Sequence, residues 1–183
     1  SRRQRQMCIR DSYYILLSGK NMRCPDKTEE MTLPEKIILP NGLLLSDVAA
    51  MLSEGRSVLL RAKGNSMYPF IVGGRDKVVL QKEKQIRVGD IVLAYLGEKG
   101  YVLHRIYRIE DKRIVLMGDG NVSVTETCLQ ENICGKVLKI VRNGRYVDCD
   151  SPGECRKVRV WSALRPFRRY ILAACRYWRK KTG

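Results

Sequence analysis

The stretch KGNSMYPF, residues 63–70, lies between two apolar runs and holds a serine at a sharp bend. Gly64 permits a positive φ or a close backbone approach, and Pro69 fixes its own φ and lacks a backbone donor. The flanking runs, 57–62 and 76–82, are rich in Val and Leu and predict two strands. Ser66 is therefore expected on a loop between strands, either as a turn residue that bonds its own backbone or as a reactive hydroxyl.

Apolar runs separated by turn signals continue along the chain and predict further short strands at 90–96, 101–109, 112–117 and 133–141. The Asn143-Gly144 pair indicates a closing hairpin. Before the first strand, residues 44–55 predict a short helix, with Ser46 or Asp47 as the cap and Gly55 as the stop. Short strands joined by hairpins, with little helix among them, indicate a mainly β fold with an antiparallel sheet.

The formal charge of +16 is unevenly distributed and divides the chain into three parts. Residues 1–30 hold seven basic and four acidic side chains, without a sustained period or a secretory pattern. We predict a poorly ordered head there and hypothesise that it is not native, with Met31 as the natural start. A β domain is expected over 31–150, which is close to neutral, and a basic tail over 156–183.

The tail contains ten Lys and Arg and no Asp or Glu from Arg156 onward. Apolar residues recur in it every three or four positions between Trp161 and Trp178, which predicts a basic amphipathic helix that Pro166 kinks or begins. Three interpretations stay open: an apolar face docked on the domain, attachment to an anionic membrane surface, and nucleic-acid binding. The last lacks a supporting motif, so no specific nucleic acid is expected.

The seven cysteines include no C-x-x-C pair, so neither a zinc site nor a disulfide framework is indicated. Reduced thiols are expected, with a bridge between Cys149 and Cys155 as the alternative. No metal or other cofactor is predicted. No apolar run reaches the length of a transmembrane helix, and we expect a cytoplasmic protein or one that is peripheral at a membrane surface.

Three boxes in order carry a resemblance: the Gly-x-Ser-Met-x-Pro pattern of 64–69, GRDKV at 74–78 and RVGDIV at 87–92. Together they resemble the nucleophile region of the signal peptidase I family, which shares its fold with the SOS-repressor autopeptidases. The resemblance covers roughly residues 55 to 140. It implies that fold and a nucleophilic Ser66, and we expect Met67 and Pro69 beside it to contact the substrate.

His104 is the single histidine of the chain and lies in the alternating strand 101–109. An isolated strand histidine is often structural, but His-Arg-Ile here resembles the His-Arg-Val of the endoplasmic-reticulum and archaeal signal peptidases. Bacterial relatives have a lysine base at that place. The resemblance implies that His104 is the general base for Ser66, in an acyl-enzyme mechanism.

The carboxylate expected to orient this histidine is Asp119, in the box Gly-Asp-Gly-Asn that resembles Gly-Asp-Asn-Asn of the histidine type. The same box is also a good plain β-turn. A second acid of the histidine type is missing here, since Thr125 occupies its place. Either Asp119 serves alone, Glu126 substitutes, or the third member is weak. The small hydroxyl residue that assists the oxyanion hole in bacterial relatives is Gly64 here.

The resemblance implies a serine endopeptidase that cleaves extended leader or signal-like peptides with small side chains before the scissile bond. Two alternatives stay open. One is a self-cleaving regulator, although the first 54 residues lack the DNA-binding helix-turn-helix of the SOS repressors. The other is a non-catalytic binding module on the same fold.

Overall fold

The computed structural model describes residues 13–17, 37–39 and 41–182. Its helices are α1 (Asn41–Ser53), α2 (Pro152–Ala163) and α3 (Arg168–Thr182), with short 3-10 turns at Gly97–Lys99, Gln130–Asn132 and Arg165–Phe167. The strands are β1 (Tyr13–Leu17), β2 (Ile37–Leu39), β3 (Val58–Arg61), β4 (Lys77–Gln81), β5 (Ile91–Tyr95), β6 (Tyr101–Glu110), β7 (Arg113–Met117), β8 (Thr125–Leu129), β9 (Ile133–Arg142) and β10 (Arg145–Asp148).

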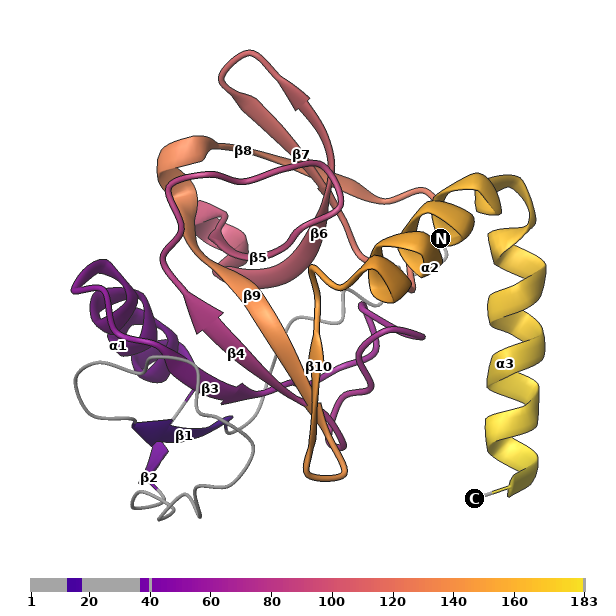
Figure 1. Cartoon of the computed structure of the whole chain (residues 1–183), viewed down its shortest axis with the longest axis horizontal. Coiled ribbons are helices and arrows are strands. Elements are labelled where there is room, and N and C mark those ends of the chain that lie inside the picture. The colour runs from indigo at the N-terminus through magenta and orange to yellow at the C-terminus, as the bar shows by residue number, and fades with distance from the viewer. Residues whose placement is uncertain (1–12, 18–36, 40, 183) are drawn as a thin grey trace.

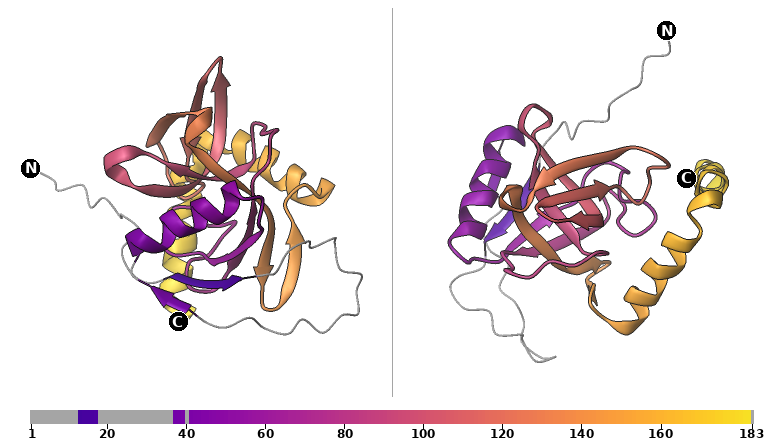
Figure 2. Two further views of the ribbon diagram at one scale, coloured as in Figure 1. Left: turned by 90° about the vertical axis from the view of Figure 1, so that its left-hand side faces the viewer. Right: turned by 90° about the horizontal axis from the view of Figure 1, so that it is seen from above.

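The strands form one antiparallel sheet in the order β2-β1-β3-β4-β9-β5-β6-β7-β8, and β10 pairs with β9 as a hairpin (Figure 1). Strands β5 to β8 follow one another as neighbours, whereas β9 returns to the middle and pairs with both β4 and β5. Helix α1 lies on one side of the sheet and α2 on the other (Figures 1 and 2). The mainly β, antiparallel fold with a short helix before the sheet and helices after it is confirmed.

Two apolar clusters fill the interior, and alternate residues of β5 belong to each: Ile91 and Leu93 to the first, Val92 and Ala94 to the second. The first lies under α1, where Val48 and Leu52 pack against strand residues such as Leu60 and Leu80. The second is formed by β5 to β9 and includes Ile106 and Leu116 among its buried side chains. Alternation of buried and exposed residues in β3 and β4 follows the side-chain period of two in a strand.

The predicted boundaries agree with the structure to within about three residues for the helix at 44–55 and for the six strands from 57–62 to 133–141. Gly55 ends α1 with a φ of 79°, as a helix stop requires. Strands β2 and β8 were not predicted. Neither was β1, which pairs with β3 although it lies within residues 1–30; the rest of that head lies outside the described residues.

The basic tail is two helices and not one. Ser151 caps α2, with Pro152 in the first turn, and Pro166 lies in the 3-10 turn that separates α2 from α3. Trp161 of α2 is buried, whereas Tyr177 and Trp178 of α3 are 65% and 71% exposed. No helix in the described part of the chain has the length and apolar character needed to cross a bilayer.

Candidate active site

Ser66 lies in the loop between β3 and β4, which folds into consecutive tight turns. Gly64 has a φ of 78°, and the backbone N–H of Ile71 donates to the Met67 carbonyl at 2.9 Å. At the end of the loop, the fully buried carboxylate of Asp76 accepts the Val72 N–H at 2.9 Å. These bonds fix the loop that carries the serine.

Residues 118–121, which follow β7, close against this serine loop. The Gly120 N–H donates to the Ser66 carbonyl at 2.8 Å. A Cβ atom at position 118 would lie 2.4 Å from the Ser66 carbonyl oxygen, and one at position 120 would lie 2.5 Å from the Asn65 carbonyl oxygen. Real Cβ atoms do not approach so closely, so glycine at 118 and 120 is what lets the two loops touch.

His104 lies in β6, and its ring reaches the same place. The residue is 8% exposed. A Cβ atom added at Gly118 would lie 3.2 Å from His104 Nε2 and 2.4 Å from the Ser66 carbonyl oxygen. The imidazole and the Ser66 backbone carbonyl therefore both lie next to Gly118. Two residues predicted from separate motifs, 38 positions apart in the sequence, meet there.

The carboxylate that contacts the His104 ring belongs to Glu126. Its Oε2 lies 2.7 Å from His104 Nδ1, and its Oε1 lies 3.6 Å from Lys99 Nζ. The pairing follows from strand register, because Leu116 of β7 is opposite both Ile106 of β6 and Glu126 of β8. Directly paired residues and residues two apart along a strand share one face of a sheet, which brings Glu126 to His104.

The hydrogen bond with His104 lowers the pKa of Glu126 below its ordinary value, although burial opposes this shift. Glu126 is therefore a carboxylate at neutral pH. When the Nδ1–H of His104 donates a hydrogen bond to this carboxylate, Nε2 is left as the acceptor, at the end of the ring near Gly118 and the Ser66 carbonyl.

Asp119, the residue expected to orient the histidine, is paired with Arg105 instead. Arg105 Nη2 lies 2.6 Å from Asp119 Oδ2 and Arg105 Nε lies 2.9 Å from Oδ1, with both residues buried. Arg105 also donates to the Gly89 carbonyl at 2.6 Å. Side chains of adjacent residues on a strand point to opposite faces, so the carboxylate held by Arg105 lies away from the face of His104.

Met67 and Pro69, the residues expected to contact substrate, line different concave surfaces. Met67 is 4% exposed and belongs to the main core, where it lines a small apolar hollow together with Ser66 and Leu103. Pro69 lines a larger groove beneath α2. The serine itself lines the small hollow, and the larger groove begins three residues later at Pro69.

Helix α2 contacts the loops of the site directly. The indole N–H of Trp161 donates to the Asp119 carbonyl at 3.2 Å, and its ring meets Phe70 edge-on with centroids 6.2 Å apart. Arg168, at the start of α3, is also buried and donates to the Asn121 carbonyl at 3.3 Å. No short motif around Trp161 indicates this packing; the apolar period of the tail is its one sequence signal.

The cysteines at 128, 134, 149, 155 and 175 are free thiols, so Cys149 and Cys155 are not bridged. The Cys155 thiol donates to the Cys149 carbonyl at 3.8 Å. Burial raises the pKa of Cys149 to about 12. Among the described side chains, no group of three or more His, Cys, Asp or Glu could hold a metal ion.

Comparison with known proteins identifies a family to which the sequence is similar. The model of the Peptidase S24-like family matches residues 12–138, a range that holds Ser66, His104 and Glu126. No curated protein matches the chain significantly.

Proposed function

Because this chain belongs to the Peptidase S24-like family, we propose that it is a serine endopeptidase with Ser66 as nucleophile and His104 as general base. Glu126 takes the third role, in place of Asp119. The observation that carries the proposal is the convergence of the three residues. Glu126 lies 2.7 Å from one nitrogen of His104, and the other nitrogen faces the contact between Ser66 and Gly118.

In this mechanism Nε2 of His104 takes the Ser66 proton as Oγ attacks the carbonyl carbon of the scissile bond. Glu126 stabilises the imidazolium that forms. The imidazolium then gives the proton to the leaving amine, which releases the first product and leaves an acyl-serine. A water molecule, deprotonated by the same imidazole, hydrolyses the ester and restores Ser66.

The substrate is proposed to be an extended leader or signal-like peptide. The hollow beside Ser66 is lined by aliphatic side chains from several elements: Leu45, Leu60, Ala62, Ile71, Leu93 and Leu103. Its apolar lining suits a small uncharged side chain next to the scissile bond. This feature supports cleavage of another chain, whereas the family match alone is equally compatible with a self-cleaving regulator.

Incubation of the full chain with a mixture of extended peptides, followed by mass spectrometry, tests the proposal. The expected result is cleavage after small residues by the wild type and none by Ser66→Ala. Intact mass after incubation of the protein alone separates the alternatives, because a self-cleaving regulator is cut at one internal bond. A binding module retains peptides and cleaves none.

We propose further that α3 lies on an anionic membrane surface. Tyr170, Tyr177 and Trp178 are all more than half exposed on this helix, and Arg169 stacks on the Tyr170 ring at 4.4 Å. Exposed aromatic residues beside many basic ones are typical of helices in a membrane interface. Helix α2 does not share this role, because its Trp161 packs on the domain.

A further inference from the structure

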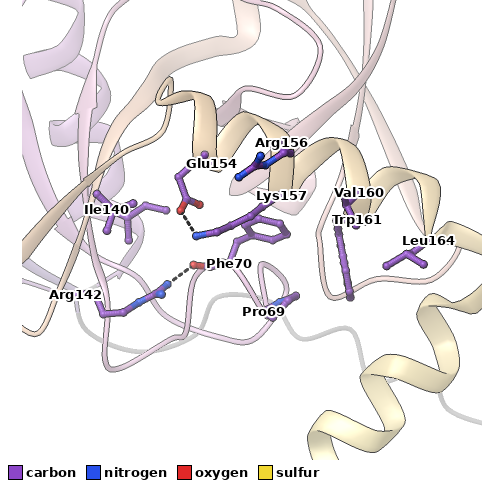
Figure 3. A pocket seen from close by; sticks show the side chains of 12 residues that line it. Pro69, Phe70, Ile140, Arg142, Glu154, Arg156, Lys157, Val160, Trp161 and Leu164 are labelled. Carbon is purple, nitrogen blue, oxygen red and sulfur yellow. Dashed lines mark hydrogen bonds and ion pairs between the residues drawn. The ribbon is translucent and has the colours of Figure 1, made fainter.

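A groove of about 500 Å³ separates α2 from the serine loop and the β9-β10 hairpin (Figure 3). Its apolar lining comes from all three elements. Phe70 belongs to the loop, Ile140 and Val147 to the hairpin, and Val160 and Leu164 to α2 and its end. Val160 is 53% exposed, so an apolar side chain bound in the groove would cover surface that water now contacts.

Basic side chains surround this apolar surface. Arg142, Arg156 and Lys157 line the groove, and the one acidic residue in its lining is Glu154. Glu154 accepts a hydrogen bond from Lys157 at 2.5 Å, which leaves a net excess of positive charge. Arg142 is 39% exposed and donates to the Phe70 carbonyl at 2.7 Å and to the buried Asp76 carboxylate at 3.3 Å, so its guanidinium is fixed between the groove and the serine loop and its charge is partly offset.

The serine loop connects the groove to the candidate active site. Pro69 and Phe70, three and four residues after Ser66, form part of its lining. An extended peptide advances about 3.3 Å per residue. A peptide with its scissile bond at Ser66 therefore reaches the groove within a few residues.

We propose that this groove binds a flanking segment of the substrate that carries apolar side chains and at least one carboxylate. The inference rests on the proposed peptidase function and defines its substrate class. Apolar side chains fill the floor, and a carboxylate lies among Arg142, Arg156 and Lys157. The proteolytic step then requires both a small residue at the hollow and an acidic, apolar segment a few residues away.

Peptide binding to the full chain carrying Ser66→Ala tests this without cleavage. The probe is a fluorescein-labelled peptide of two alanines followed by three Leu-Glu repeats, and its control has glutamine for every glutamate. Fluorescence anisotropy gives both dissociation constants. We expect the glutamate peptide to bind more tightly and to lose that advantage as the salt concentration rises.

Variants of α2 locate the site. Arg156→Glu with Lys157→Glu should weaken binding of the glutamate peptide about 3- to 10-fold, the scale of a few exposed charge pairs, and affect the glutamine peptide little. Glu154→Gln should strengthen it. Arg159→Glu is the matched control, because Arg159 is exposed on the same helix but does not line the groove. Val160→Ser should weaken both peptides.

Equal binding of the two peptides overturns the inference, as does an Arg159→Glu effect as large as that of the double variant. The double variant also overturns the inference if it loses binding to phosphatidylserine vesicles but keeps the preference for the glutamate peptide. In that case Arg156 and Lys157 bind lipid. A third outcome separates the two proposals. If the wild type cleaves no peptide but its preference for the glutamate peptide depends on Arg156, the peptidase proposal is refuted and the groove remains a binding site.

Discussion

Glu126→Gln tests which carboxylate serves the histidine. Glutamine preserves the size of the side chain and its distance to His104 Nδ1, 2.7 Å in the wild type, but removes the negative charge. The amide can also present its NH₂ group to Nδ1 and so favour the tautomer with the proton on Nε2, which cannot accept the serine proton. Both effects act on the rate of acylation more than on the fold.

The size of the effect follows from the geometry. Two unit charges about 4 Å apart interact by about 4 kcal/mol at an effective dielectric constant of about 20. Both side chains are largely shielded from solvent, with exposed fractions of 10% for His104 and 13% for Glu126. Loss of this stabilisation in the transition state corresponds to about 10³-fold in rate, and the remaining amide dipole reduces it to between about 10²- and 10³-fold.

Asp119→Asn is the matched comparison, because it removes a carboxylate of the same neighbourhood that contacts Arg105. Breaking one partner of a buried ion pair costs about 3–5 kcal/mol of folding stability. We expect a lower urea midpoint for this variant but a kcat within about tenfold of the wild type, once it is normalised to the folded fraction by circular dichroism. A larger kcat loss for Asp119→Asn than for Glu126→Gln would refute the assignment of Glu126.

Three further outcomes are expected. The lowered pKa of Glu126 means that its hydrogen bond with His104 stabilises the fold above the unfolded-state value of 4.5. This stabilisation decreases as the pH falls through the lower folded-state value, so the urea midpoints of wild type and Glu126→Gln should converge in acid. Cys149, with its pKa raised to about 12, should resist iodoacetamide at pH 8 until the protein unfolds; labelling at the rate of a free peptide thiol would show an open α2. The full chain should co-sediment with anionic vesicles and not with zwitterionic ones, whereas Tyr177→Ser with Trp178→Ser should bind less; equal sedimentation with both lipids excludes the electrostatic attachment of α3.

Local patterns were enough to predict the sheet and to place two candidate site residues on their elements, Ser66 on a loop between strands and His104 on a strand. Gly64 and Pro69 mark the bend at Ser66, and the alternation around His104 marks its strand. Glu126 could only be an alternative, because its strand, Thr125–Leu129, is too polar to read as one. Its approach to His104 depends on the register of three strands, which no local pattern specifies.

The contact that Asp119 makes was not readable from the sequence for a related reason. The Gly-Asp-Gly box predicted a tight turn but not the direction of the Asp119 carboxylate. That direction is set by Arg105, the neighbour of His104 on the opposite face of β6. The groove under α2 was equally hidden, because it joins residues near 70, 142 and 160 that only the fold brings together.

The most direct test of the proposed mechanism is the rate at which a fluorophosphonate probe labels the full chain, followed by peptide mapping. Such probes react with a serine whose hydroxyl is activated by a base. We predict one adduct per chain, located on Ser66, and a rate lowered at least about 10²-fold by His104→Ala. An adduct on another residue, or an equal rate in the His104→Ala variant, would contradict the account.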